Sequence, residues 1–251
     1  MSIFTIDVGN THTHCALMDS AKVDYCCDFA TGKFIGEFDF GGLSCIDGIC
    51  WCSVVPDVSA RLGEVLAKLP FKSVNLNYKN SPLKIDLKRP DLLGQDRLAV
   101  AIGAMCFMEP PYIVADMGTA VTIDVVDSSG TYAGGAIAPG LSAFTSYLNE
   151  KTAQLPLIDI ANADFDMSIG KDTVEAMSVG CVKGFCKLAD GIISDIERDF
   201  FGTKGAFDKT VFTGGYVELL PKKWLAGRRI EPNLANIGLA KAFELILKKE
   251  S

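Results

Sequence analysis

The pattern of apolar and polar positions in the first half of the chain predicts strands that alternate with helices. Short apolar runs bounded by Gly, Asp, Asn or Pro are typical of strands, and longer runs with apolar residues on one side are typical of helices. Asp57 follows Pro56 and is expected to cap the first helix. The expected strands are 3–8, 15–18, 23–29, 49–55 and 73–76, and the expected helices are 57–69 and 94–108.

The second half repeats this alternation after a break at Pro110-Pro111. Proline lacks the amide donor that a helix requires and clashes with the preceding turn, so this dipeptide is expected to end the helix before it. We therefore predict two domains, 1–109 and 110–251. Beyond the break the expected strands are 112–115, 121–126, 132–138 and 209–212, and the expected helices are 173–200 and 234–249.

One short motif occurs in both halves. Ile6-Asp-Val-Gly-Asn-Thr11 is echoed by Ala115-Asp-Met-Gly-Thr-Ala120. In each copy an apolar strand leads into Asp-x-Gly, and a second strand-like run follows within a few positions. The recurrence predicts a duplicated α/β unit.

An Asp-x-Gly at the tip of a hairpin is suited to binding phosphate. Glycine lets the backbone approach closely, and the following amides and hydroxyls can donate hydrogen bonds to phosphate oxygens. The aspartate repels phosphate, so its natural partner is a cation such as Mg²⁺. A single Asp-x-Gly is often an ordinary β-turn. Two copies, each at the start of a similar half, favour a nucleotide clamped between two hairpins.

Two glycine-rich segments are consistent with the same kind of site. Residues 134–140, Gly-Gly-Ala-Ile-Ala-Pro-Gly, offer a close backbone approach or a hinge. Residues 213–215, Thr-Gly-Gly, follow a strand and precede an expected helix, where a helix N-terminus can accommodate a nucleotide. Each segment is also consistent with a simple tight turn.

Asp96 has two interpretations. It lies in Leu93-Gly-Gln-Asp-Arg97, at the start of an expected helix, where a carboxylate is favoured by the helix dipole. A kinase that phosphorylates an alcohol also needs a carboxylate to orient and deprotonate the hydroxyl, and an adjacent arginine can bind an anionic substrate. The residues alone leave both interpretations open.

Composition restricts the classes of partner. The formal net charge of −7 and the pI of about 4.9 repel a phosphate backbone, so nucleic acid is not an expected partner. The first residues lack the basic and apolar segments of a secretory signal, and no apolar run approaches the length of a membrane span. Nine scattered cysteines fit reduced thiols in a cytoplasmic protein.

In combination these motifs resemble the type III pantothenate kinases. The family pattern is Asp-x-Gly-Asn-Thr, Gly-x-Asp-Arg, Asp-x-Gly-Thr-Ala-x-Thr-x-Asp, Gly-Gly-x-Ile-x-Pro-Gly and Thr-Gly-Gly. These motifs lie here, in that order, at 7–11, 94–97, 116–124, 134–140 and 213–215. The resemblance implies an α/β, duplicated actin-like (ribonuclease H-like) two-domain fold with the nucleotide in the interdomain cleft. It also implies ATP-dependent phosphorylation of (R)-pantothenate to 4′-phosphopantothenate, the first step of coenzyme A synthesis.

The resemblance further implies a role for each matching residue. Asp96 is the catalytic base, and Asp116 holds a monovalent cation, K⁺ or NH₄⁺. Asp7 lies near Mg²⁺ through the phosphates. Thr173 contacts the substrate across the interface of a homodimer. The ATP contacts are Asp7, Val8, Gly9, Asn10, Thr11, His12, Thr13, His14 and Thr119, and the pantothenate contacts are Gly94, Gln95, Asp96, Arg97 and Thr173.

Leu87 departs from the family pattern. Members often carry a tyrosine seven residues before the glycine of Gly-x-Asp-Arg, where this chain has Leu87. Leucine keeps the apolar contact but lacks the hydrogen bond of the phenol, so a related kinase with another small-molecule substrate stays an alternative. A second alternative is a regulatory relative that acts by binding, against which the acidic charge and the intact aspartates argue.

Overall fold

The chain folds into two compact units, each described here by itself. The computed structural model describes residues 1–19, 22–160, 166–202 and 207–250. Unit 1 comprises Met1–Pro110, Ser129–Gly134 and the segment from Asn233 onward, and unit 2 comprises Pro111–Ser128 and Gly135–Pro232. The division expected between residues 109 and 110 places the C-terminal helix in the second domain, whereas its contacts are with the first unit.

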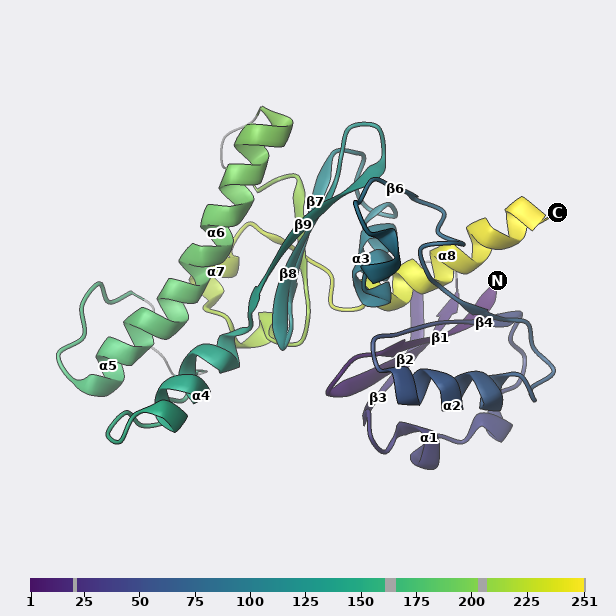
Figure 1. The fold of residues 1–251 in the computed structure, drawn as a ribbon, viewed down its shortest axis with the longest axis horizontal. Coiled ribbons are helices and arrows are strands. Elements are labelled where there is room, and N and C mark those ends of the chain that lie inside the picture. Colours follow the sequence, from purple (N-terminus) through teal and green to yellow (C-terminus); the bar gives the residue numbers. More distant parts are fainter. Residues whose placement is uncertain (20–21, 161–165, 203–206, 251) are drawn as a thin grey trace. The chain divides into compact units, whose positions relative to one another are not determined.

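Unit 1 is built on a five-stranded sheet with the order β3-β2-β1-β4-β5 (Figure 1). The pairs β1/β2 and β2/β3 are antiparallel, and β4 and β5 run parallel to β1. All five expected strands of the first half are present. Their bounds are β1 Ser2–Val8, β2 His12–Asp19, β3 Lys22–Ala30, β4 Gly48–Ser53 and β5 Ser73–Asn75.

The two faces of this sheet pack against different helices. Because side chains alternate along a strand, Phe4, Ile6 and Val8 of β1 share one face, where they join an apolar core with residues of α1 and α2. Thr5 lies on the other face, and its hydroxyl donates to Oδ1 of Asn236 on α8 at 2.9 Å. The helices of this unit are α1 Phe34–Glu37, α2 Pro56–Leu66, α3 Gln95–Ala104 and α8 Leu234–Glu250.

Helices α3 and α8 approach each other closely because glycines lie at their contact. A Cβ on Gly238 would overlap the carbonyl of Ala99, and one on Gly103 would overlap the carbonyl of Leu234. With no side chain between them, the two backbones pack directly, and α8 also contacts β1, β2 and β4. The middle and end of α3 are therefore held against the C-terminal helix.

Two helix boundaries differ from the expectation. Helix α2 begins at Pro56, and Asp57 lies within its first turn with no capping bond from the preceding Val55, so the expected Asp57 cap is wrong. Helix α3 ends at Ala104 rather than at the expected Met108, because the next residues form turns with the helix end, as in the 3.2 Å bond from Met105 N to Ile102 O. The prolines thus follow a helix that has already ended.

Unit 2 repeats the strand order of unit 1. Its sheet has the order β9-β8-β7-β10-β11, with β7/β8 antiparallel and both β7/β10 and β10/β11 parallel. The first residues of β9 belong to unit 1, where they pair with the short strand β6. The predicted duplication is confirmed. The bounds are β6 Lys84–Ile85, β7 Tyr112–Met117, β8 Ala120–Val126, β9 Thr131–Pro139, β10 Thr210–Thr213 and β11 Arg229–Ile230.

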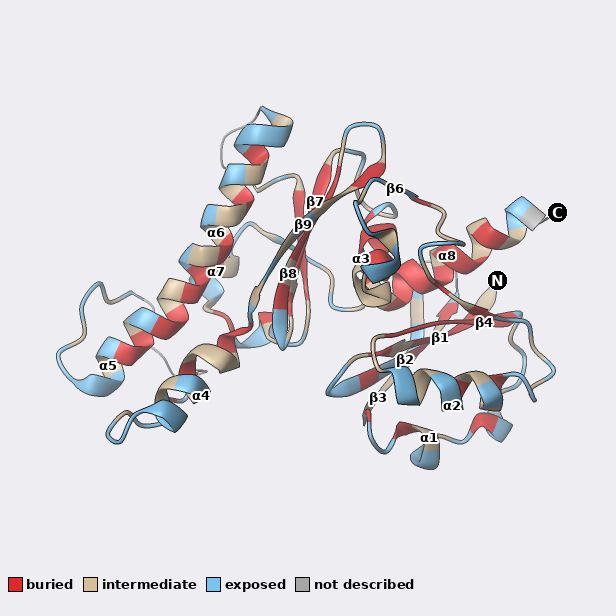
Figure 2. Cartoon of the chain, in the orientation of Figure 1, coloured by how far each residue is buried: buried red, intermediate tan, exposed pale blue. Residues whose placement is uncertain are grey.

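The helices of unit 2 pack on a core that includes residues of β7, β8 and β10. The long helix expected over 173–200 is present as α5 and α6, which are joined by a π-helical turn at Ser178–Lys183, and a second π-helical turn at Glu197–Phe201 follows α6. Buried residues follow one side of it (Figure 2). The helix bounds are α4 Leu141–Lys151, α5 Thr173–Met177, α6 Gly184–Ile196 and α7 Lys222–Leu225.

Two features of unit 2 lie outside the expectation. Helix α4 was not predicted, although Leu141, Phe144 and Leu148 recur at helical spacing. The helix expected after Thr213-Gly-Gly is only a 3-10 turn at Val217–Leu219. Within the ranges that the structure describes, no helix is long and apolar enough to cross a membrane.

Candidate active site

The turn between β1 and β2 carries the first Asp-x-Gly. Gly9 N donates to His12 O at 3.0 Å and closes the turn. From the end of β3, the Thr31 hydroxyl donates to Gly9 O at 2.7 Å and Thr31 N donates to Thr11 O at 3.0 Å. Three strands thus hold the backbone of this turn in place.

The side chains of this turn differ in how far they are exposed to solvent. The side chains of Val8 and Thr13 are fully buried, and the Thr13 hydroxyl is hydrogen-bonded to that of Thr31 at 3.1 Å. The side chains of Asn10, Thr11 and His12 are exposed at the tip. A ligand at this turn therefore meets exposed polar side chains together with main-chain groups.

Asp7 lies in a row of polar side chains that crosses the sheet. It is paired with His14 on β2 and with Cys52 on β4, and the Cys52 thiol donates to Asp7 Oδ1 at 3.2 Å. The His14 Nδ1 is in turn 2.7 Å from Asp28 Oδ1 on β3. Burial raises the pKa of the Cys52 thiol well above its ordinary value, so the thiol keeps its proton and serves as the donor.

The carboxyl groups of Asp7 and Asp96 influence each other. Burial, with a smaller contribution from the charge of Asp96, raises the pKa of Asp7 to about 6. Burial likewise raises the pKa of Asp96, although the backbone N–H and the charge of Arg97 oppose this rise. Two half-buried carboxyls whose ionisation is disfavoured are typical of a catalytic or ion-binding site rather than of structural capping.

Gly94 makes room for the carboxyl of Asp96. Gly94 is the N-cap of α3, and a Cβ there would lie 2.5 Å from Asp96 Oδ1. Any other residue at this position would move the carboxyl from its place. The aliphatic stem of Arg97 also passes this glycine, with its Cδ 3.6 Å from the same point.

The side chain of Gln95 is engaged within the protein. Its Oε1 accepts from Ser53 N at 2.8 Å and from Asn75 Nδ2 at 3.2 Å, and its Nε2 donates to Asn75 Oδ1 at 3.3 Å. Sequence reasoning missed both partners, because they are the last residues of β4 and β5 and no local motif marks them. We call Gln95, Ser53 and Asn75 the amide clasp.

The second Asp-x-Gly forms an equivalent turn in unit 2. Gly118 N donates to Ala120 O at 3.1 Å, and Gly140 N donates to Thr119 O at 3.1 Å. The Thr119 side chain is exposed, whereas Asp116 is half-buried. Asp116 occupies the penultimate position of β7, as Asp7 does in β1.

Both glycine-rich segments of unit 2 pack against this turn. Gly214 has a φ of +96°, and a Cβ on it would overlap the carboxylate of Asp116. A Cβ on Gly140 would overlap the carbonyls of Gly118 and Thr119. Close backbone approach, expected from the sequence, is what both glycines provide.

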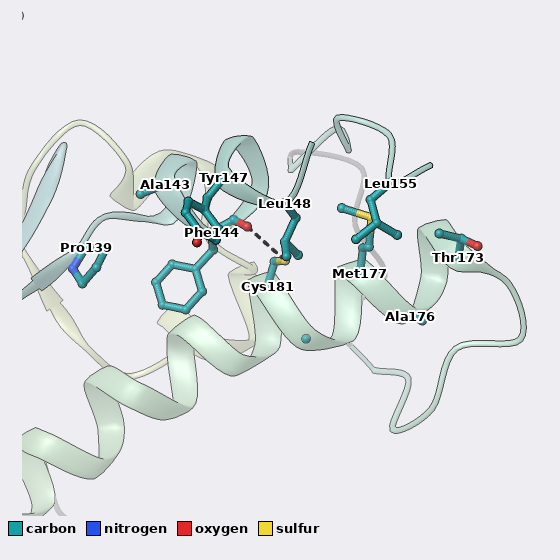
Figure 3. Close-up of a pocket in the computed structure, with 11 residues that line it drawn as sticks. Pro139, Ala143, Phe144, Tyr147, Leu148, Leu155, Thr173, Ala176, Met177 and Cys181 are labelled. Carbon is teal, nitrogen blue, oxygen red and sulfur yellow. Dashed lines mark hydrogen bonds between the residues drawn. The ribbon is translucent and has the colours of Figure 1, made fainter. Parts of the chain in front are cut away.

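Thr173 lies elsewhere in unit 2, on the wall of an apolar groove of about 720 Å³. Figure 3 shows Pro139 and Thr173 far apart among the residues that line it. The remaining lining is almost wholly apolar and comes from α4, the segment after it, α5 and the first π-helical turn. It consists of Ala143, Phe144, Tyr147, Leu148, Leu155, Ala176, Met177, Gly180 and Cys181.

The carboxylates fit a magnesium ion that is bound through phosphate. Among the described residues, no group of three or more His, Cys, Asp or Glu side chains comes together to hold a metal. Mg²⁺ commonly binds through one or two carboxylates, with waters and substrate phosphates as its other ligands. Asp7, with Asp96 nearby, matches that donor set.

Comparison of the sequence with known families gives one match that covers most of the chain. The model of the family described as type III pantothenate kinase matches residues 3–195. A type III pantothenate kinase from Streptomyces avermitilis is 34% identical over 267 residues, with 96% of this chain and 97% of the relative covered. One from Akkermansia muciniphila is 37% identical over 193 residues, with 77% and 76% covered.

Solved structures with similar folds have low sequence identity and inform the fold alone. A Campylobacter jejuni protein assigned to the Baf family of transcriptional activators has a TM-score of 0.66 at 19% identity, covering 98% of each chain. A ROK family glucokinase from Streptomyces griseus, solved with glucose and AMPPNP, has a TM-score of 0.52 at 13% identity, covering 99% of this chain and 100% of its own. The expected duplicated actin-like fold is confirmed.

The raised pKa of Asp7 predicts how its removal affects stability. Between about pH 4 and 6 the folded state binds more protons at Asp7 than the unfolded state, so stability falls as pH rises through this range. Asp7→Asn should therefore stabilise the protein at pH 7.5 by roughly 1–2 kcal/mol, after a discount for solvent screening, and by less at pH 5. Urea unfolding at both pH values measures the difference.

The control for this prediction is Asp24→Asn, because Asp24 is exposed on edge strand β3 of the same sheet. We expect it to change the free energy of unfolding little at either pH. A lower stability of Asp7→Asn than of the wild type at pH 7.5 would contradict the unfavourable burial of the Asp7 charge.

Proposed function

Since this chain belongs to the type III pantothenate kinase family, we propose that Asp96 is the base in the family's reaction. The protein is a phosphotransferase, and its reaction is the ATP-dependent phosphorylation of pantothenate that begins coenzyme A synthesis. The product is 4′-phosphopantothenate, formed when the primary hydroxyl of pantothenate takes the γ-phosphoryl group.

The observation that carries the role of Asp96 is its burial beside Asp7 at the start of α3. Burial raises the pKa of Asp96, so its carboxylate accepts a proton more readily than an exposed aspartate does. The carboxylate orients the hydroxyl and removes its proton as the bond to phosphorus forms. Such proton transfer assists a reaction whose barrier is lowered mainly by positioning and charge stabilisation.

ATP is bound by the Asp7 turn and by Thr119. In the Asp7 turn the exposed side chains of Asn10, Thr11 and His12 make direct contacts. Val8, Gly9 and Thr13 contribute main-chain groups, and His14 lies beside Asp7. Mg²⁺ is the divalent cation near Asp7, and when bound it neutralises charge on the phosphates.

Asp116 holds a monovalent cation, K⁺ or NH₄⁺. The support is its half-buried carboxylate, against which the main chain of Gly214 packs. Oxygen ligands of this kind suit a hard cation. A cation there offsets charge near the phosphates.

Pantothenate is contacted by the segment Gly94 to Arg97. The carboxylate of pantothenate suits the guanidinium of Arg97, which follows the base directly in sequence. Leu87 is half-buried and faces Gly134, with its Cδ2 3.4 Å from where a Cβ would stand. It provides an apolar wall without the hydrogen bond that a tyrosine would add.

The apolar groove of unit 2 is an interface between two copies of the chain. Its lining is apolar and includes Tyr147, which is 62% exposed, and the neighbouring Val174 is 50% exposed, which is costly for a surface that faces water. A homodimer covers this surface and brings Thr173 of the partner subunit to the substrate. A C₂ interface of this kind is self-complementary.

The protein acts in the cytoplasm. All nine cysteines, each within the described part of the chain, are free. Reducing conditions in the cytoplasm keep such thiols unpaired.

Asp96→Asn should abolish transfer while leaving ATP bound. We expect kcat to fall by about 10²- to 10⁴-fold, because the amide cannot take the hydroxyl proton. A coupled ADP-release assay with and without pantothenate measures this, and calorimetry measures ATP affinity. The matched control is Asp91→Asn, which removes an exposed carboxylate paired with Arg89. Near-normal turnover of Asp96→Asn would show that another group is the base.

Replacing K⁺ by Na⁺ in the same assay should lower the rate of the wild type, and NH₄⁺ should restore it. Asp116→Asn should remove this dependence on the cation and lower the rate in K⁺ to that seen in Na⁺. Asp208→Asn, a charge change on the exposed residue two positions before β10, serves as the control. A variant that keeps the wild-type response to K⁺ would place the cation elsewhere.

Subunit mixing tests whether the site is shared. Asp96→Asn and Thr173→Ala should each be nearly inactive alone. If the partner subunit supplies Thr173, a dimer with one chain of each kind has one intact site, so random mixing should restore about a quarter of wild-type activity. Activity that never exceeds the sum of the two variants would mean that Thr173 acts within its own subunit or not at all.

A further inference from the structure

The first turn of α3 has no capping side chain of the usual kind. Gly94, its N-cap, makes no side-chain hydrogen bond. Asp96 Oδ1 accepts from the neighbouring Arg97 N at 2.7 Å, a bond within the first turn itself. Because the first four amides of a helix have no partner inside the helix, the position of this turn depends on contacts from outside it.

The amide clasp supplies such contacts at the residue next to Asp96. Gln95 Oε1 accepts from the main chain at Ser53, just where β4 ends, and from the side chain of Asn75. Gln95 Nε2 donates back to Asn75 Oδ1. The oxygen and the nitrogen of the Gln95 amide are thereby both hydrogen-bonded, and their partners lie on strands β4 and β5 of the sheet of unit 1.

The amide clasp includes the last residue of β4, the strand whose Cys52 donates a hydrogen bond to Asp7. Ser53 directly follows Cys52, whose thiol donates to Asp7 Oδ1. Val54 N donates to Val8 O at 3.0 Å, so the end of β4 is also bonded to the residue after Asp7. One short path of hydrogen bonds and paired strands thus connects Gln95 with Asp7.

Asn75 is itself held firmly. The main-chain carbonyl of Asn75 accepts from Asn77 Nδ2 at 3.0 Å and from Asn80 Nδ2 at 2.8 Å. The side-chain Nδ2 of Asn75 lies 3.4 Å from Trp51 O. A partner that is bonded on several sides loses little freedom when it binds one more group. The clasp is therefore a preorganised support.

We propose that Gln95 is a positioning residue, whose clasped side chain sets where the carboxylate of Asp96 stands relative to Asp7. The inference rests on the proposed role of Asp96 as the base. It assigns the side chain of Gln95 to Ser53 and Asn75, so that pantothenate meets this residue only through its main chain. Displacing a reacting group by about 1 Å can cost about 100-fold in rate, which makes such a support consequential.

Steady-state kinetics of Gln95→Ala and Asn75→Ala test the proposal. Each should lower kcat by about 10- to 100-fold and change KM for pantothenate and for ATP by less than about threefold. The double variant should be no slower than the slower single variant, because either change opens the same clasp. In the Asp96→Asn background, Gln95→Ala should have no further effect on the residual rate.

The matched control is Asn77→Ala, which removes a hydrogen bond to the Asn75 carbonyl but leaves the clasp intact. It should keep kcat within about threefold of the wild type. A rise in KM for pantothenate with unchanged kcat in Gln95→Ala would overturn the proposal and make the side chain a substrate contact. Additive losses in the double variant would also overturn it.

Hydrogen exchange separates this inference from the proposed function. If the clasp orders the start of α3, the amides of Arg97 and Leu98 should exchange at least about tenfold faster in Gln95→Ala than in the wild type. Exchange at these amides in Asn77→Ala should match the wild type, and the protection of β1 and β4 should be unchanged in both variants. A wild type without pantothenate-dependent turnover would refute the function, and unchanged exchange at the two amides would refute the clasp. Loss of protection throughout the chain in Gln95→Ala, with normal protection and normal kcat in Asn75→Ala, would also refute it.

Discussion

The arrangement of unit 1 follows from one constraint, which is to keep two carboxyl groups, Asp7 and Asp96, half-buried and near each other. Burial raises the pKa of both carboxyls, and the charge of Asp96 raises that of Asp7 further. The fold opposes this tendency with rigid supports. The Cys52 thiol donates to Asp7, and the amide clasp and the glycine contact between α3 and α8 hold the helix that carries Asp96. The carboxyls are thus poised for ligands and protons at some cost in stability.

Duplication accounts for the similarity of the two units, and divergence accounts for their roles. Both sheets have the same strand order, and both place an aspartate at the penultimate position of the first strand, as Asp7 and Asp116. In unit 1 the start of α3 brings Asp96 near Asp7. Unit 2 instead brings Gly140 and Gly214 against its turn, and its helices form an apolar groove. One backbone plan therefore supports a pair of buried carboxyls in one unit and close backbone contacts in the other.

Local pattern was sufficient for most elements of the sheets, because alternating apolar residues and glycine turns act over a few positions. It failed where contacts between residues distant in the sequence determine the structure. The Asp57 cap was wrong because Pro56 begins the helix itself. The C-terminal helix packs on unit 1, where Gly238 lets it approach the backbone of α3, a contact between residues far apart in the chain. Helix α4, with Leu141, Phe144 and Leu148 at helical spacing, was readable from the sequence and was missed.

The sequence by itself determined the repeat, the two Asp-x-Gly turns and the family, because these depend on short motifs whose backbone needs are local. It also singled out Asp7, Asp96 and Asp116. Only the tertiary structure decided which side chains act on them. The Cys52 thiol, Ser53 and Asn75 meet Asp7 and Gln95 across strands, at separations of 20 residues or more. Pairing of strands and crossing of helices, rather than any local pattern, brings such residues together.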